Sequence, residues 1–151
     1  MYTMIYDSPI GPLYIAEQDD AISHLMFSPL TGGEARETPL LKACAQQLDA
    51  YFDGSLQTFD LPLVPKGTAF QTKVWQMLQT IPYGTTWSYK MLAEAVGSPR
   101  GYRAVGLANN RNPISILIPC HRVVGATGKL TGYGGGLSNK EYLLHLEEAV
   151  S

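Results

Sequence analysis

The sequence predicts two small domains: an α/β N-terminal domain with a small antiparallel sheet, then a mainly α C-terminal domain that contains a helix-turn-helix. Alternating apolar residues and turn signals fill the first sixty residues, a pattern typical of short strands. A stretch with two prolines, a glycine and no periodicity follows at 61–68 and indicates a linker. Beyond it, capped segments with helical spacing continue almost to residue 151, which favours helices.

The N-terminal domain, residues 1–62, is expected to contain three strands and one helix. The strand candidates are YTMIY, LYIAE and AISHLMF, with turns at DSPIGP and EQDD. Thr38 as N-cap, Pro39 at the first helical position and Gly54 just past the end predict a helix between them. Cys44 lies on the apolar face of this helix, so we expect a buried and unreactive thiol.

We place the linker at 63–68 and the second domain at 69–151. Thr68 predicts the start of a helix whose apolar residues recur at helical spacing, and IPYGTT ends it. At 151 residues the chain is long enough for two such domains with a real core.

Two further short helices are expected at 89–96 and 99–110. Gly97 ends the first, and Ser98 with Pro99 caps and starts the second. Two short helices across so tight a turn match the helix-turn-helix pattern, although an ordinary helical hairpin is the commoner motif.

Basic residues gather in the second half of the chain. The net charge is −2, yet residues 1–62 carry nine acidic and two basic residues, whereas 87–129 carry six basic and one acidic residue. This asymmetry indicates a polyanionic partner for the second half. Many solvated faces show a similar excess, so the charge pattern is a weak signal by itself.

The helix predicted at 99–110 combines two arginines with small residues. Its small residues are Gly101, Ala104, Gly106 and Ala108, and its arginines are Arg100 and Arg103. Because glycine inside a helix costs up to about 1 kcal/mol relative to alanine, two of them require a reason. Close approach of a phosphate backbone would explain both residue types. Tight packing on a neighbouring helix would explain the glycines but not the arginines.

Several function classes are excluded by composition. Two cysteines are too few for a disulfide framework, and three histidines do not supply zinc ligands at short spacing. No apolar run reaches the length of a membrane span, and the N-terminal segment lacks the features of a signal peptide. We therefore expect a cytoplasmic protein without a metal ion or membrane association.

The segment NPISILIPCHRVVG, residues 112–125, places Cys120 and His121 directly after a proline. ISILI predicts a buried strand, so Cys120 would follow a rigid element, where catalytic groups are commonly placed. A thiolate is the nucleophile, and an imidazole backed by an acid can remove its proton. Neighbours in extended chain point to opposite sides, which favours a relay through a water. Asn112 before Pro113 indicates a turn; an amide that ties this turn to the cysteine segment is the alternative.

The acid behind His121 should be buried, and helical spacing in SNKEYLLHLEEAV selects Glu147. Ser138 and Glu141 match a capping box. Glu141, His145 and Glu148 share one solvated face. Glu147 instead follows Leu143 by four residues and Leu144 by three, on the apolar stripe, where a carboxylate needs a partner.

Together these segments resemble the methylated-DNA–protein-cysteine methyltransferases, also called O6-alkylguanine-DNA alkyltransferases. NPISILIPCHRVVG is very close to the active-site signature of that family. The resemblance covers about 70–147 through FQTKVWQML, TTWSYKMLAEAVG, YRAVGLANNRNP and LTGYGGGLSNKEYLLHLE. Over 1–62 it is looser and rests on SPIGPL and LDAYFDG.

This resemblance implies roles for the residues that match the motifs. Cys120 would accept the alkyl group, with His121 and Glu147 completing a water-bridged relay. Asn112 would act as a hinge that hydrogen-bonds backbone near the cysteine, and Tyr89 would assist guanine as leaving group and press on the flanking phosphate.

The resemblance also implies a DNA-binding surface and a base pocket. Arg103 would enter the duplex where the nucleotide is extruded. The expected DNA-binding residues are Tyr89, Arg100, Gly101, Arg103, Ala104 and Arg111, and the expected pocket residues are Val123, Tyr133 and Gly134. Some relatives carry a serine where this chain has Gly134, and a backbone N–H would serve equally there. Zinc-binding relatives use several Cys and His in the N-terminal domain, where this chain has Cys44 and His24, so no metal is inferred.

The implied function is the repair of double-stranded DNA containing O6-alkylguanine, with O4-alkylthymine as a further candidate substrate. A monomer would transfer the alkyl group to itself once, without a cofactor. Two other functions stay open: a module that binds DNA lesions without alkyl transfer, and a Cys-His hydrolase, which would need an oxyanion hole and a deacylating water.

Overall fold

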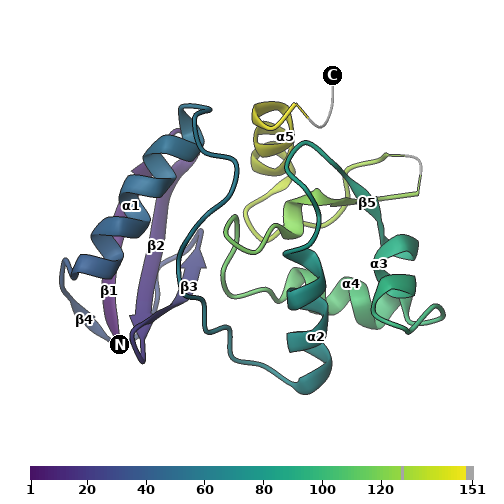
Figure 1. The fold of residues 1–151 in the computed structure, drawn as a ribbon, viewed down its shortest axis with the longest axis horizontal. Helices are drawn as coiled ribbons and strands as arrows, with labels where there is room; N and C mark the ends of the chain where they lie inside the picture. The colour runs from purple at the N-terminus through teal and green to yellow at the C-terminus, as the bar shows by residue number, and fades with distance from the viewer. Residues whose placement is uncertain (127, 149–151) are drawn as a thin grey trace.

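The structure of the chain is a computed structural model that describes residues 1–126 and 128–148. A sheet covered by helix α1 forms one side of the molecule, and the remaining helices form the other (Figure 1). The sheet-containing N-terminal half and the helical C-terminal half confirm the predicted fold class.

The N-terminal sheet has four strands in the order β3-β2-β1-β4. β1 (Tyr2–Ser8), β2 (Gly11–Gln18) and β3 (Ala21–Met26) pair antiparallel, as predicted. The two-residue β4 (Glu34–Ala35) pairs parallel with β1 and was not predicted. Both of its residues are exposed, so no apolar pattern marks the strand.

Helix α1 (Pro39–Phe52) begins and ends at the residues that the sequence indicates. The Thr38 hydroxyl accepts a hydrogen bond from the backbone N–H of Leu41, and Gly54 takes a φ of +86° just beyond the helix. Cys44 is fully buried on the face toward the sheet. Burial raises the pKa of the Cys44 thiol to about 12, which makes it a poor nucleophile.

The proline-rich segment after α1 is hydrogen-bonded to the sheet. Ile22 in β3 donates to the Pro62 carbonyl at 2.8 Å and accepts from the N–H of Val64 at 2.8 Å. The segment then leads into the C-terminal half, where it joins α2 (Figure 1). The division of the chain at 63–68 into two domains stays a prediction.

The described part of the C-terminal half contains four α-helices and a two-stranded parallel pair, β5 and β6. Their bounds are α2 (Ala69–Leu78), β5 (Trp87–Ser88), α3 (Tyr89–Ala95), α4 (Tyr102–Asn110), β6 (Val123–Val124) and α5 (Leu137–Leu146). Thr68 and Gln71 form a capping box at the start of α2, consistent with the predicted N-cap.

The start predicted for α4 is wrong. Gly97, with a φ of +77°, ends α3 as expected, but α4 begins at Tyr102 with Gly101 as its N-cap. A turn closed by the Gly101 N–H and the Ser98 carbonyl, 2.8 Å apart, separates the two helices. Arg100 therefore lies in this turn, and only Gly106 of the two glycines is inside the helix.

The strand predicted for ISILI is also wrong. Residues 114–118 are buried but form a compact turn in which Ile116 has a φ of +72°. The N–H of Ile118 donates to the Ile114 carbonyl at 3.0 Å, and Ile114 makes one parallel bridge to Leu25 of β3. The apolar run predicts burial correctly, whereas the backbone path is set by the side chain of Asn112, described below.

The predicted capping box of the last helix does not form. Helix α5 begins at Leu137, one residue before Ser138, and its N-cap is Gly136, which has no side chain to bond the first turn. Ser138 and Glu141 thus lie inside the helix. Glu141 is exposed and lies 3.9 Å from His145, so the predicted solvated face is present.

Apolar side chains from both halves form one core cluster, which extends from Leu13 and Ile15 in the sheet to Leu143 in α5. Within residues 1–126 and 128–148, no helix has the length and apolar character needed to cross a membrane.

Candidate active site around Cys120

Cys120 opens a short 3₁₀ turn, Cys120–Arg122, immediately after Pro119. Its own N–H donates to the Ile118 carbonyl at 2.8 Å. The side chain is almost fully buried, with 4% of its surface exposed. Because the turn brings Cys120, His121 and Arg122 into tight succession, the extended conformation assumed from the sequence does not apply here.

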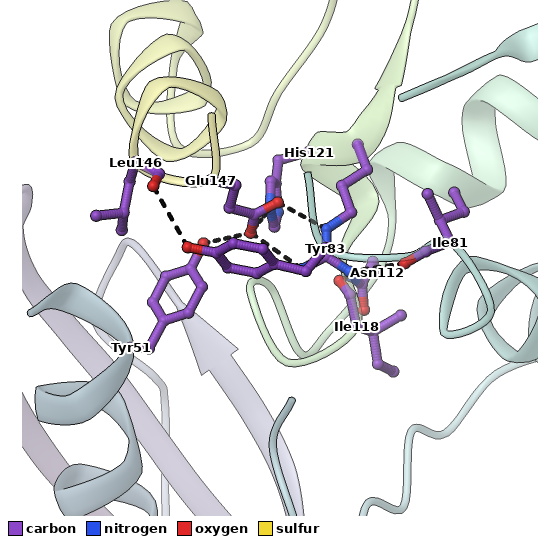
Figure 2. Close-up of polar contacts among 9 residues, drawn as sticks. Tyr51, Ile81, Tyr83, Asn112, Ile118, His121, Leu146 and Glu147 are labelled. Atoms are coloured by element: carbon purple, nitrogen blue, oxygen red, sulfur yellow. Dashed lines mark hydrogen bonds and ion pairs between the residues drawn. The ribbon is translucent and has the colours of Figure 1, made fainter. Parts of the chain in front are cut away.

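Asn112 fixes the loop that leads to Cys120. Its Oδ1 accepts from the N–H of Ile114 at 2.9 Å. Its Nδ2 donates to the Ile118 carbonyl at 2.8 Å, and Figure 2 shows Asn112 beside Ile118. A longer contact of 3.4 Å runs from Nδ2 to the Ile114 carbonyl. The buried amide of Asn112 therefore stabilises the local turn and also hydrogen-bonds the segment that leads to Cys120. Its role as a hinge stays a prediction.

His121 and Glu147 form a buried pair. His121 Nε2 lies 2.8 Å from Glu147 Oε2, and both side chains are fully shielded from solvent. Since an ionised carboxylate only accepts hydrogen bonds, Nε2 carries the proton and Nδ1 is the free acceptor. Nδ1 is buried without a hydrogen-bond partner in residues 1–126 and 128–148. This tautomer suits a base that takes a proton at Nδ1.

Two more side chains, those of Arg122 and Tyr51, hold the Glu147 carboxylate, and Figure 2 shows Tyr51 beside it. Arg122 donates from Nε to Oε1 at 2.8 Å and from Nη2 to Oε2 at 3.0 Å, while its Nη1 donates to the Ile81 carbonyl. The Tyr51 hydroxyl donates to Oε2 at 2.5 Å. Glu147 caps the C-terminal end of α5, so these contacts join the last helix to the cysteine turn and to α1.

The pKa values of the pair follow from burial and charge. Burial opposes ionisation of Glu147, but the hydrogen bonds and charges of His121 and Arg122 outweigh it and lower the Glu147 pKa to about 2. Burial lowers the pKa of His121, and the attraction of Glu147 only partly offsets this. At neutral pH the site therefore holds a carboxylate beside a neutral imidazole.

Burial also raises the pKa of the Cys120 thiol above its ordinary value. The side chains of Asn112 and Ser115 and the positive charge of Lys140 oppose this effect. Cys120 is thus a protonated thiol at neutral pH and needs a base to become a nucleophile.

Cys120 lines a cavity of about 150 Å³ at the junction of the two halves. The cavity is bordered by Met26, Phe27, Ser28, Asn109, Asn110, Asn112, Ser115, Cys120, Tyr133 and Gly134. The Tyr133 ring lies edge-on to Phe27, at 5.5 Å between centroids. Its hydroxyl is buried and makes no hydrogen bond to the described part of the chain. A larger cavity of 230 Å³ borders Pro119 and Arg122 instead.

The cavity contains some of the predicted site residues and excludes others. Asn112, Cys120, Tyr133 and Gly134 line it. Val123 is buried in β6 and does not border the cavity; its carbonyl accepts a hydrogen bond from Lys140 Nζ.

The predicted DNA-binding residues lie on α4, in the turns that flank it and, for Tyr89, at the start of α3. Arg100, Arg103, Ala104 and Arg111 are exposed, and Gly101 is half-buried. Tyr89, half-buried at the start of α3, accepts a hydrogen bond from Thr131 at 3.3 Å. Its ring lies beside Gly106, where an added Cβ would be 3.8 Å from Tyr89 Cδ1. Tyr102 and Leu107 add exposed apolar surface to α4.

Several residues of the site were missed by the sequence interpretation. Lys140 is fully buried, and its Nζ donates to the carbonyls of Val123 and Thr131. It precedes Leu143 by three residues and Leu144 by four, so the spacing that selects Glu147 also marks Lys140. Asn109 donates to the Cys120 carbonyl at 3.4 Å, with its Oδ1 buried and without a partner in residues 1–126 and 128–148. For Asn109, no sequence signal indicates this placement.

Comparisons with known proteins match the chain along nearly its whole length. The family model described as "6-O-methylguanine DNA methyltransferase, DNA binding domain" matches residues 69–149. The model described as "6-O-methylguanine DNA methyltransferase, ribonuclease-like domain" matches residues 1–65.

Individual relatives agree with these matches. A methylated-DNA–protein-cysteine methyltransferase of Methanosarcina barkeri is 53% identical, with 98% of each chain covered. A protein of the same name from Mycolicibacterium paratuberculosis is 50% identical, with 96% of this chain and 91% of the relative covered. The crystal structure of Mycobacterium tuberculosis OGT in complex with DNA superposes with a TM-score of 0.92 at 46% identity, over 99% of this chain and 94% of that one.

Proposed function

The chain belongs to the methylated-DNA–protein-cysteine methyltransferase family, and from this membership we propose that it repairs DNA by moving the alkyl group of O6-alkylguanine onto Sγ of its own Cys120. The observation that carries the proposal is a buried cysteine in a cavity, next in sequence to a histidine that a buried glutamate holds in one tautomer. The relative solved with DNA supports DNA as the partner.

The chemistry requires a thiolate, and the site offers a base to make one. His121 Nδ1 takes the proton of Cys120 through a water, and Glu147 stabilises the imidazolium that results. The thiolate then attacks the alkyl carbon in line with its bond to guanine O6. The C–O bond breaks as the S–C bond forms. The guanine anion takes a proton from the Tyr89 hydroxyl and leaves as neutral guanine, and the Tyr89 phenolate regains a proton from solvent.

Access to Cys120 requires the base to leave the helical stack. The cysteine is 4% exposed at the wall of a cavity, so a stacked base cannot reach it. Extruding a nucleotide costs a few kcal/mol. Helices α3 and α4 would dock as a helix-turn-helix, with Arg103 filling the vacated position and the small residues of α4 against the minor groove.

The product fixes the number of turnovers. The alkylated cysteine is a thioether, and no group in the relay can cleave its S–C bond. Each molecule, acting as a monomer, therefore repairs one base.

Intact-mass measurement after incubation with a duplex containing O6-methylguanine tests this function. The expected result is one methyl in place of one hydrogen per molecule, mapped by peptide analysis to Cys120. Cys120→Ser should abolish transfer and leave DNA binding largely unchanged, whereas Cys44→Ser should transfer normally because Cys44 is buried in α1. Methyl on Cys44, repeated turnover, or an unmodified protein would each contradict the proposal. The same assay with O4-methylthymine tests the second candidate substrate.

A further inference from the structure

We infer that Tyr51, from helix α1 of the N-terminal half, is a positioning residue of the Cys120 site: its hydroxyl shares Glu147 Oε2 with His121 and sets how strongly the carboxylate holds the imidazole N–H. The inference deepens the proposed function and rests on it for its meaning in catalysis. It assigns the N-terminal half a direct part in the relay.

Three donors converge on a single oxygen of Glu147. The Tyr51 hydroxyl lies 2.5 Å from Oε2, His121 Nε2 lies 2.8 Å from it, and Arg122 Nη2 lies 3.0 Å from it. Figure 2 shows the Tyr51 side chain extending from α1 toward this carboxylate. Tyr51 and His121 are fully buried and Glu147 is 1% exposed, so water does not screen the competition between the donors.

The charged and titratable groups around Glu147 come from several elements. They include Tyr51 on α1, Tyr83 after α2, His121 and Arg122 on the cysteine turn, and Tyr133 before α5, with Lys140 on α5 acting on His121. Burial, and after it the negative charge of Glu147, raise the pKa of Tyr51 far above its ordinary value. Tyr51 therefore keeps its proton at every working pH and acts as a fixed donor.

The consequence of this sharing has a definite sign. A hydrogen bond to a carboxylate stabilises its charge, so the Tyr51 donation weakens the pull of Oε2 on the His121 N–H. Without the Tyr51 hydroxyl, the bond from Nε2 to Oε2 should strengthen and the pKa of His121 should rise. Glu147→Gln should act in the opposite direction, because it removes the negative charge itself.

Tyr51→Phe separates this role from packing. The Tyr51 ring contacts the rings of Phe52, Phe59 and Tyr83, at centroid distances of 5.3, 5.3 and 6.4 Å, and phenylalanine retains those contacts. Tyr6→Phe is the matched control. The Tyr6 hydroxyl donates to Asp49 Oδ1 at 2.6 Å, which is the same kind of bond in the same half of the chain, at a carboxylate other than Glu147.

The test is an NMR measurement on the DNA-free protein labelled with ¹⁵N-histidine. His24 and His145 serve as internal references, since the chain has three histidines. For Tyr51→Phe we expect the Nε2 proton of His121 to move downfield at fixed pH. We also expect its pKa to rise, with a ~3–10-fold increase in proton affinity. Tyr6→Phe should leave both quantities at their wild-type values.

An unchanged His121 resonance, or an equal change in Tyr51→Phe and Tyr6→Phe, would overturn the inference. Should Tyr51→Phe fail to fold, site-specific incorporation of 3-fluorotyrosine at position 51 keeps the bond and makes the donor more acidic, so the Nε2 proton should move upfield. No shift, or a downfield one, would be an equally clear refutation. Because the resonances are read without DNA, failure of methyl transfer and failure of this inference are separate results.

Discussion

The ammonium group of Lys140 is fully buried and donates to the carbonyl oxygen of Val123 at 2.6 Å. A second bond, 2.8 Å long, reaches the carbonyl of Thr131, so Lys140 joins β6 to the segment that precedes α5. Burial lowers the pKa of Lys140 to about 8, and the nearby Cys120 opposes that change. At neutral pH the lysine therefore places a positive charge beside a thiol that must ionise.

Lys140→Met should raise the pKa of the Cys120 thiol and slow its reaction with iodoacetamide at neutral pH by up to about tenfold. The reason is that the positive charge of Lys140 favours the thiolate. The rate is measured against pH in a Cys44→Ser background, so that one thiol reacts. Lys42→Met, at an exposed position of α1, is the control and should match wild type. A pH profile shared by both variants would show that Lys140 only supports the backbone.

Glu147 should make the stability of the fold depend on pH in the acid range. Its folded pKa of about 2 lies below its ordinary value of 4.5, so its contribution is complete above about 4.5 and is lost as the pH falls toward 2. The shift corresponds to about 3 kcal/mol. Urea unfolding of the wild type between pH 2 and 7 should show this loss.

Glu147→Gln should flatten that slope and lower the free energy of unfolding at pH 7 by about 3–5 kcal/mol, because Arg122 loses its buried partner. Glu141→Gln is the matched control. The Glu141 side chain is 60% exposed, so the free energy of unfolding of Glu141→Gln should match that of the wild type at every pH. An acid slope that survives in Glu147→Gln would mean that another group is responsible.

Arg103→Ala should slow transfer from duplex DNA at least about tenfold, equivalent to about 1.4 kcal/mol, and leave transfer from the free O6-methylguanine base unchanged. Arg103 is exposed on α4, and its proposed role of filling the vacated stack exists only in a duplex. Single-turnover rates on both substrates provide the measurement.

Arg100→Ala separates this role from general phosphate binding. Arg100 lies in the turn before α4, and its loss should weaken duplex binding and lower the salt dependence by about one counterion. Equal losses on duplex and free base in Arg103→Ala would assign that residue a structural role.

Gly106→Ala should stabilise the fold while it weakens duplex binding. An added Cβ would meet Tyr89 at 3.8 Å, an ordinary contact, so packing inside the protein does not require glycine. Alanine improves helix propensity by about 0.8–1.0 kcal/mol, which thermal melts can detect. Duplex affinity, measured in a Cys120→Ser background, should fall because the methyl separates α4 from the DNA. Unchanged affinity would place Gly106 away from the DNA surface.

Local signals predicted those parts of the fold that depend on local chemistry. The helix after Thr38 and the helix after Thr68 begin where expected, because an N-cap side chain bonds the first turn whatever lies beyond it. The strand prediction for ISILI was wrong because apolar residues indicate that a segment is buried but do not determine the path of its backbone. The amide of Asn112 holds that path in a turn. The predicted start of α4 was wrong because a hydrogen bond between Ser98 and Gly101 closes a turn in place of the first helical residues.

The candidate site was predictable where helical spacing carries the information. Glu147 and Lys140 both lie on the apolar stripe of the last segment, and only the glutamate was selected. Tyr51 lies 96 positions from Glu147 in the chain. Its contact arises from the docking of α1 against the C-terminal half, and no periodicity within either segment encodes that docking.

The separation between His121 and Glu147 has a consequence for synthesis on the ribosome. The acid that fixes the imidazole is added 26 residues after it, which takes roughly 1–5 s at about 5–20 residues per second. Throughout that interval the nascent chain contains Cys120 without the carboxylate that supports its base. The proton relay to His121 is therefore complete only after the last helix has formed, because Glu147 lies at the C-terminal end of that helix.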